Sequence, residues 1–306
     1  MAIFLSTYLP DTDDHSQQQV VAKGLANGVD VKHPFQLVEP HDITNIFRPR
    51  VPFSHKGTYG HSLIVAGSKY TMGAALLAAK ACLHGGAGLT TLSIPSSGLA
   101  ALNTALPEVM FLDREQLAGG MDTLSKYTTI AIGPGLGIDE EHTLELILDL
   151  KKPIVIDADA LTIFAEHHRL FNKIPENSIL TPHMKEFDRL FGAHRTWWDR
   201  LQTGIARAKS LNIVIVLKNE RTFIIDQNGT VLINPTGNPA MAQGGMGDAL
   251  TGIITAFVAQ GYDAKQAALL GVYFHGKSGD ELAKNANSVT ATEVILQVSR
   301  AIKHHP

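Results

Sequence analysis

A cluster of glycines precedes a lone carboxylate in the last quarter of the chain. Gly244, Gly245 and Gly247 lead into Asp248, and the residues that follow are apolar at helical spacing. Glycines let the backbone approach a ligand closely, and amides at a helix N-terminus favour an anion. Such an array would stabilise a phosphoryl group in transfer, with Asp248 accepting the proton of the attacking hydroxyl. Asp248 as a simple helix cap is the alternative, and the glycine cluster favours chemistry.

The elements that must position this segment alternate between strands and helices. Such alternation is typical of a doubly wound α/β fold, with a mostly parallel central sheet and helices on both faces. Asn228-Gly229 marks a hairpin turn, so residues 221–235 are predicted to form a β-hairpin at the sheet edge. Three helices are predicted to follow the hairpin, at about 246–260, 264–284 and 290–303.

Several loops are predicted to meet at one edge of that sheet, because ligands of such folds bind beyond the carboxyl ends of the strands. These loops are "GSKYTMGA", "IGPGLG", "DADAL", "TPHMKE", "LKNERT" and "QGGMGD". Six loops at one edge predict an enzyme that handles phosphate.

Single residues in these loops have simpler explanations that stay open. Asp157 and Asp159 would meet a metal or ribose hydroxyls, or Asp159 would cap the next helix. His183 and Glu186 stand three apart, which also suits a helix entry with Glu186 as the capping partner. Lys218 would meet a phosphate or remain a solvated lysine.

Composition and charge exclude several classes of protein. The chain has 306 residues, of which 44% are hydrophobic and 18% charged, with a formal net charge of −3. No block of Lys or Arg exceeds two residues, so no nucleic-acid partner is expected. Cys82 is the single cysteine, which excludes an internal disulfide and a cysteine zinc site. No apolar run reaches the length of about 18 residues that a membrane helix needs.

The N-terminal region differs from the rest of the chain. Residues 1–38 are predicted to be an arm or linker, partly disordered, with "PDTDDHSQQQ" as its polar part. The stretch "FQLVEPHDI" is where the ordered part is expected to begin, and residues 39–306 are predicted to form one catalytic domain. The first residues lack the basic start and long apolar core of a signal peptide, so a cytoplasmic location is expected.

Seven motifs together resemble one known family. They run in order from about residue 39 to 303 and include "SHKGTYGHSLIVAGS", "IGPGLG", "IDADAL", "TPHMKEF", "LKNERT" and "GNPAMAQGGMGD". The set resembles the ADP/ATP-dependent NAD(P)H-hydrate dehydratases, which belong to the ribokinase-like superfamily. The resemblance implies a ribokinase-like fold and the repair of hydrated NADH or NADPH, by phosphorylation of the added hydroxyl and elimination of phosphate.

The resemblance also implies the roles of particular residues. Asp248 would be the catalytic base and would contact the hydrated cofactor together with Ala74, Gly135 and His183. Glu186 would lie near Mg²⁺. The adenine nucleotide, ADP or ATP, would be contacted by Lys218, Asn219, Glu220, Arg221, Thr222, Gly244, Gly245 and Gly247.

The chain departs from the family pattern at three positions. Met184 and Lys185 stand where the family usually has Pro-Gly, and Met246 replaces the usual Thr. Two rival functions are a small-molecule kinase of the same fold, acting on hydroxymethylpyrimidine or hydroxyethylthiazole, and a nucleotide sensor without activity. The resemblance further suggests a homo-oligomer, as a tetramer, and a functional link to a separate NAD(P)H-hydrate epimerase, because residues 1–38 are too short to form one.

Overall fold

The computed structural model describes residues 3–9, 19–20 and 35–305. In the N-terminal region, β1 (Ile3–Phe4) pairs antiparallel with β2 (Gln19–Val20). Most of the arm predicted over residues 1–38 lies outside the described residues. Its division from a domain at 39–306 therefore stays a prediction.

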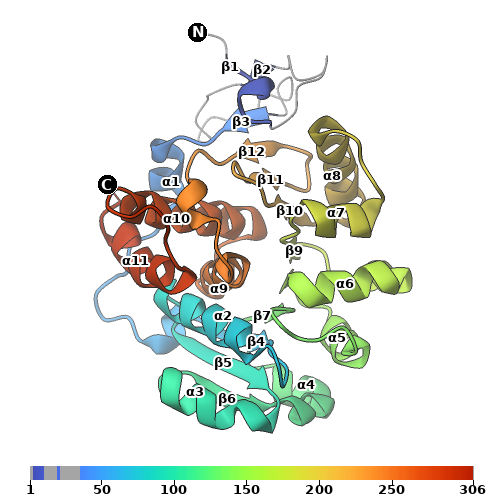
Figure 1. Ribbon diagram of the computed structural model, residues 1–306. Coiled ribbons are helices and arrows are strands. Elements are labelled where there is room, and N and C mark those ends of the chain that lie inside the picture. The colour runs from blue at the N-terminus through green and yellow to red at the C-terminus, as the bar shows by residue number, and fades with distance from the viewer. Residues whose placement is uncertain (1–2, 10–18, 21–34, 306) are drawn as a thin grey trace.

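The described residues form one large sheet with ten strands (Figure 1). The strand order is β3-β12-β11-β10-β9-β8-β7-β4-β5-β6. Its pairs are parallel, except that β11 pairs antiparallel with both β10 and β12. The strands are β3 (Phe35–Leu37), β4 (His61–Val65), β5 (Leu89–Ile94), β6 (Met110–Asp113), β7 (Thr129–Ile132), β8 (Ile154–Ile156), β9 (Ile179–Leu180), β10 (Val214–Leu217), β11 (Phe223–Ile225) and β12 (Val231–Ile233).

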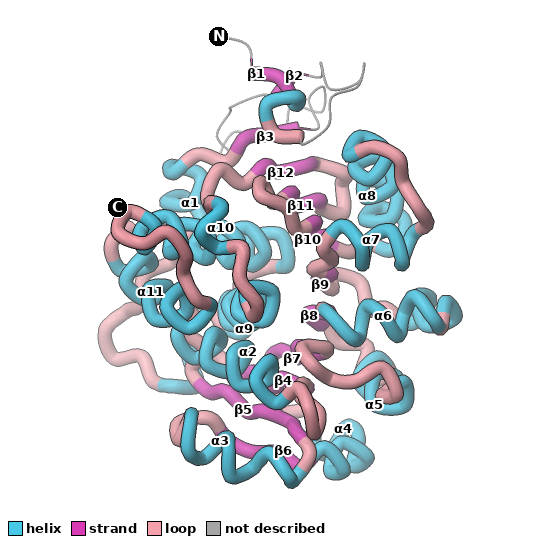
Figure 2. The backbone as a smooth tube through the Cα atoms, in the orientation of Figure 1, coloured by secondary structure: helices cyan, strands magenta, loops and turns pink. Residues whose placement is uncertain are grey.

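Helices cover both faces of the sheet (Figure 2). Alternate strand residues enter two separate hydrophobic cores: Ile64 faces one, and Leu63 and Val65 face the other. One layer holds α1 (Pro40–Ile46), α2 (Met72–His84), α3 (Leu99–Ala105), α9 (Met246–Ala259), α10 (Ala264–Ala283) and α11 (Ala291–Lys303). The other holds α4 (Gly120–Leu124), α5 (Glu141–Leu148), α6 (Ala158–Glu166), α7 (Met184–Phe191) and α8 (Trp197–Leu211). The predicted α/β class is confirmed, and the three last helices end within one residue of their predicted limits.

The predicted hairpin forms from β11 and β12, with Gly229 at a φ of 82° in its turn. It is not the last element of the sheet, however. Strand β3 pairs parallel with β12 and forms the edge, so the sheet begins at Phe35 within the "FQLVEPHDI" stretch. A strand of three residues is too short for an alternating pattern of apolar and polar residues to be recognised in the sequence.

Helices α2 and α9 touch backbone to backbone. A Cβ atom at Gly252 of α9 would lie 2.1 Å from the carbonyl oxygen of Ala78 in α2, so only glycine fits there. Helix α9 is buried along most of its length between the sheet, α2 and α10. This packing fixes the start of α9 beside the start of α2.

No helix in the described part of the chain is both long and apolar enough to cross a membrane.

Candidate active site

The loops after β4 and β7 are joined at the carboxyl edge of the sheet. The Gly67 N–H donates to the Pro134 carbonyl at 2.8 Å, and the Thr71 hydroxyl donates to the Gly135 carbonyl at 2.6 Å. A Cβ at Gly135 would lie 3.0 Å from the Cβ of Ala74. Ala74 and Gly135, both assigned to the hydrated cofactor by resemblance, are therefore neighbours.

The N-terminus of α9 has no side-chain cap. Its N-cap residue, Gly245, has a left-handed backbone with φ of 86°, and a Cβ there would lie 2.6 Å from Leu77 Cδ1 on α2. The amides in the first turn of any helix lack carbonyl partners within that helix. The N–H groups of Met246, Gly247 and Asp248 are thus available to an anion at this point.

A buried ion pair lies beside this helix mouth. Lys218, at the end of β10, places its Nζ 2.8 Å from Asp157 Oδ1 at the end of β8. The other oxygen of Asp157 accepts a hydrogen bond of 2.6 Å from Thr251 of α9. A Cβ at Gly247 would stand 3.4 Å from the same Nζ, so the absence of a side chain keeps the approach to the lysine open. Lys218 is a paired and mostly buried cation, and the solvated alternative is wrong.

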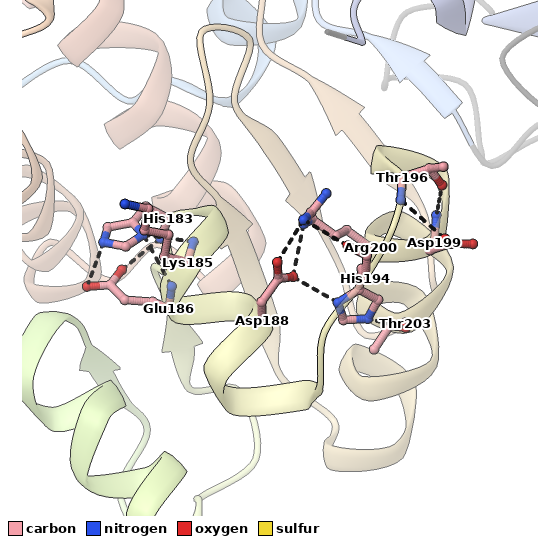
Figure 3. Close-up of polar contacts among 9 residues, drawn as sticks. All are labelled: His183, Lys185, Glu186, Asp188, His194, Thr196, Asp199, Arg200 and Thr203. Atoms are coloured by element: carbon pink, nitrogen blue, oxygen red, sulfur yellow. Dashed lines mark hydrogen bonds and ion pairs between the residues drawn. The ribbon is translucent and has the colours of Figure 1, made fainter. Parts of the chain in front are cut away.

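The N-terminus of α7 is closed by its own residues (Figure 3). His183 Nδ1 accepts the N–H groups of Lys185 and Glu186 at 3.1 and 3.2 Å, and Glu186 Oε2 accepts the His183 N–H at 2.7 Å. The capping interpretation of this pair is therefore correct. Glu186 Oε2 also lies 3.7 Å from Lys218 Nζ, which brings α7 to the same site.

A second polar network fixes α7 against α8 (Figure 3). Arg200 donates two hydrogen bonds to Asp188, at 2.9 and 2.7 Å, and His194 contacts the same carboxylate at 2.9 Å. Such bidentate pairs restrict orientation as well as adding energy. These contacts fix the orientation of α7, and therefore also the position of His183 at its N-terminus.

Asp159 serves the glycine loop after β7. Its Oδ2 accepts the Gly137 N–H at 2.9 Å. Asp157 is the N-cap residue of α6 by position but makes no capping hydrogen bond. The two carboxylates therefore serve different partners, and the expected cap on α6 by Asp159 does not form. Contact of this pair with a metal or with ribose hydroxyls stays a prediction.

Electrostatics set Asp248 apart from the other carboxylates of the site. Burial, together with the charges of Asp157, Asp159 and Glu186, raises the pKa of Asp248 to about 6, against the opposing influence of Lys218. A carboxyl with this pKa is a competent base at neutral pH, because it is ionised and retains proton affinity. Burial alone would lower the pKa of Lys218, but the surrounding carboxylates raise it above its ordinary value.

A cavity of about 440 Å³ opens next to Lys218 and the mouth of α9. Five residues that the resemblance assigns to the nucleotide line it, namely Lys218, Asn219, Glu220, Thr222 and Gly247. Gly244 and Gly245 are outside its lining, and Arg221 turns away to donate to the Pro235 carbonyl.

Sequence reasoning missed His275 of α10, which also lines this cavity. Burial, followed by the charge of Lys218, lowers the pKa of His275 to about 4, while a backbone hydrogen bond with Met246 acts in the opposite direction. Its Nε2 has no hydrogen-bond partner in the described part of the chain. A histidine within an apolar helical stretch carries no local sequence pattern that predicts a site.

Comparison with known proteins shows which family the chain resembles. Residues 62–300 match the family model described as NAD(P)H-hydrate dehydratase. An ADP-dependent (S)-NAD(P)H-hydrate dehydratase from Listeria monocytogenes is 38% identical, over 82% of this chain and 90% of that protein. The bifunctional NAD(P)H-hydrate repair enzyme Nnr from Moorella thermoacetica is 42% identical over 75% of this chain. That match covers 46% of the Moorella protein, so the chain spans about half the length of such bifunctional relatives.

A solved structure shows the same architecture. The ADP/ATP-dependent NAD(P)H-hydrate dehydratase from Bacillus subtilis, co-crystallised with ATP and Mg²⁺, superimposes with a TM-score of 0.78. It is 32% identical, with 88% of this chain and 98% of that chain covered. The ribokinase-like fold class predicted from the sequence is confirmed by this likeness. With its fold, its motifs and most of its length in common with these proteins, the chain belongs to the NAD(P)H-hydrate dehydratase family.

Proposed function

We propose that this protein converts hydrated NADH and NADPH back to NADH and NADPH at the expense of ADP or ATP. The observation that carries the proposal is the uncapped mouth of α9, where Asp248 adjoins both the open amides and the cation of Lys218. This combination suits phosphoryl transfer to a hydroxyl, and the names of the relatives supply the class of substrate.

The first step is phosphorylation of the hydroxyl on the hydrated nicotinamide ring. Asp248 accepts the hydroxyl proton while the oxygen attacks the terminal phosphorus of the nucleotide, which leaves shortened by one phosphoryl group. The amides of Met246 and Gly247 and the Lys218 ammonium stabilise the charge of the transferring group. Ala74, Gly135 and His183 hold the hydrated ring so that its hydroxyl faces Asp248.

The second step eliminates the phosphate. The lone pair of the ring nitrogen expels the phosphate from the adjacent carbon, and loss of a ring proton restores the dihydropyridine. The nucleotide loses one phosphoryl group and the substrate loses the elements of water. The net change is a dehydration, which makes the enzyme a lyase although its first step resembles a kinase reaction.

The charges of the site fit a requirement for Mg²⁺. Asp157, Asp159 and Glu186 all raise the pKa of Asp248, and Lys218 is the single cation among the groups that shift it. No group of three or more metal-ligating side chains occurs in the described residues. Mg²⁺ suits such a site, since it commonly uses one or two carboxylates together with phosphate oxygens and water. Glu186 would hold it, and the bound ion would neutralise phosphate charge.

The nucleotide is assigned to the cavity beside Lys218, with contacts from Lys218 to Thr222 and from the glycine segment Gly244–Gly247. Gly247 and most of the Lys218–Thr222 segment line this cavity, which supports the assignment. For the whole protein we propose a cytoplasmic location, a homo-oligomeric state and a functional link to NAD(P)H-hydrate epimerase. The bifunctional repair enzymes among the relatives support the epimerase link.

The decisive experiment is a turnover assay. Purified protein is incubated with hydrated NADH, Mg²⁺ and either ADP or ATP, and the return of NADH absorbance is followed. Recovery that requires nucleotide supports the proposal and identifies the phosphoryl donor. Hydroxymethylpyrimidine and hydroxyethylthiazole are offered in parallel, and phosphorylation of either without recovery of NADH would favour the kinase. Nucleotide binding with no turnover of any substrate would favour the sensor.

A further inference from the structure

A second, larger cavity lies at the opposite end of the two helices that reach the active site. Helix α2 begins near Ala74 and ends at His84, and α9 begins beside Asp248 and ends at Ala259. The cavity at their far ends, here called the distal cavity, has a volume of about 860 Å³ against about 440 Å³ for the nucleotide cavity. At about 1.5 Å per residue, the length of α9 separates the two by about 20 Å.

The distal cavity gathers positive charge from separate parts of the chain. Arg48 and Arg50 come from the segment after α1, and Lys303 comes from the end of α11. Among the residues that the structure describes, Glu108 is the only carboxylate that lines the cavity. Within the described residues no carboxylate lies at ion-pair distance from Arg48, Arg50 or Lys303.

Both arginines are held in place. The Arg48 guanidinium lies 4.0 Å above the ring of Tyr262, and that of Arg50 lies 3.9 Å above the ring of Tyr59. Arg50 donates to the Gly86 carbonyl at 2.5 Å, and a Cβ at Gly86 would lie 3.2 Å from that nitrogen. Stacking and this contact already restrict the two arginine side chains, so that less conformational entropy would be lost when a ligand binds.

Capping of helix ends explains only part of this arrangement. Arg48 and Arg50 each donate to a carbonyl just beyond the end of α9 or α2, at Gln260 and Gly86, where the helix dipole favours a cation. A guanidinium has five N–H donors, so each arginine keeps most of its donors for other partners. The rest of the wall is apolar, with Phe47, Phe257 and Ile302.

We propose that the distal cavity binds a nucleoside phosphate, whose phosphate groups meet Arg48, Arg50 and Lys303 and whose base rests on the apolar wall. The volume lies within the usual range for small-molecule sites, and planar guanidinium groups match phosphate oxygens in pairs. This site is independent of the active site and of the proposed reaction.

Equilibrium dialysis with labelled ADP tests the proposal. The wild-type protein is expected to bind two ADP molecules per chain. The double variant Arg48→Gln/Arg50→Gln is expected to lose the second site by about tenfold or more in affinity, because charge-assisted hydrogen bonds disappear. It keeps the first site and the turnover rate, since neither arginine contacts the active site.

The matched control is Arg189→Gln/Arg207→Gln, which removes the same charge. Arg189 donates to Thr162 and Arg207 lies over the ring of Phe191, and neither arginine lines the distal cavity. The control is expected to keep both sites. Raising the salt concentration is expected to weaken the second site, and pyrophosphate is expected to compete for it better than adenosine.

Three results would overturn the proposal. A single ADP per wild-type chain would mean that the distal cavity binds no nucleoside phosphate. An equal loss of ADP affinity at the second site in both double variants would mean that binding depends on the overall positive charge of the protein and not on Arg48 and Arg50. A lower melting temperature with two sites retained in Arg48→Gln/Arg50→Gln would show that these arginines only cap helices.

Discussion

The helices α7 and α9 begin at the same edge of the sheet, but only one of them is closed. In α7, His183 accepts two first-turn amides and Glu186 returns a hydrogen bond to the His183 amide. In α9, Gly245 offers no side chain, and the first-turn amides stay open beside Lys218. Both helices carry an acidic residue in the first turn, Glu186 or Asp248. The same sequence feature thus serves structure in one helix and is free for chemistry in the other.

This difference shows which of the two helix N-termini can accommodate a negatively charged group. A capped N-terminus has already used its donors, whereas an uncapped one retains both donors and partial positive charge. Substitutions at matching positions should therefore distinguish the roles of the two helices. We expect mainly a loss of activity at α9 and mainly a loss of stability at α7.

The largest effect is expected at Asp248. Asp248→Asn keeps the shape of the side chain but removes proton acceptance, so turnover should fall by roughly 10²–10⁴-fold. Assays with saturating nucleotide and hydrated NADH measure the change. Asp263→Asn is the matched control, because Asp263 caps α10 through the Gln266 amide and lies outside the proposed site. Near wild-type turnover in Asp248→Asn would eliminate Asp248 as the base.

The stability of the same variant should move in the other direction. A carboxyl whose folded pKa is raised to about 6 contributes stability below its unfolded pKa and loses that contribution as pH rises through 6. Asp248→Asn should therefore match the wild type near pH 4 and exceed it at pH 8 by about 1–3 kcal/mol. Urea unfolding at the two pH values measures this, and a variant less stable than wild type at pH 8 would indicate a capping role instead.

Removal of Lys218 should have a larger effect on stability than the change at Asp248. Lys218→Met leaves Asp157 charged, buried and without its cation, which typically costs about 3–5 kcal/mol in the free energy of unfolding. Chemical denaturation gives the value. The double variant Lys218→Met/Asp157→Asn should recover much of the stability but not nucleotide affinity. Equal stability of Lys218→Met and wild type would mean that the pair contributes nothing to folding.

The pH dependence of turnover is expected to show a smaller effect. Because the pKa of Asp248 is raised to about 6, the base is ionised above that pH and becomes protonated below it. Lys218 keeps its charge throughout this range, since its pKa lies above the ordinary value. Turnover should fall about tenfold for each unit below pH 6. An acidic limb near pH 4 would place Asp248 in a more polar surrounding than its contacts indicate.

The smallest effect is expected at the closed helix. His183→Ala removes the cap of α7 and should lower the free energy of unfolding by about 0.5–2 kcal/mol. It should also weaken binding of the hydrated cofactor more than binding of the nucleotide. His183→Asn restores a capping oxygen, so stability returns while cofactor binding stays weak. Unchanged cofactor affinity in His183→Ala would limit His183 to capping.

Periodic segments made much of this fold predictable from the sequence. Helix α9 and its two successors were expected within one residue of their ends, because apolar residues at helical spacing and turn residues mark them. The loops at the carboxyl edge followed from the alternation of strands and helices. Asp248 was recognisable because glycines precede it, which is local information.

Partners distant in the chain could not be predicted in this way. The Asp157–Lys218 pair joins residues 61 positions apart, and Thr251 completes it from a third element. His275 reaches the cavity beside Lys218 only because α10 packs beside α9. Each of these depends on tertiary packing, and none has a spacing that distinguishes it from ordinary core residues.

The contact at Gly252 has a consequence for dynamics. Because α2 and α9 touch backbone to backbone there, neither helix can slide past the other without opening the core. We therefore expect Ala74 and Asp248, near the N-termini of these helices, to move together, and hydrogen exchange along both helices to be slow and correlated. Gly252→Ala should push α2 and α9 apart. In the proposed reaction this would disturb the alignment of the substrate hydroxyl with Asp248, although residue 252 contacts neither the substrate nor the nucleotide.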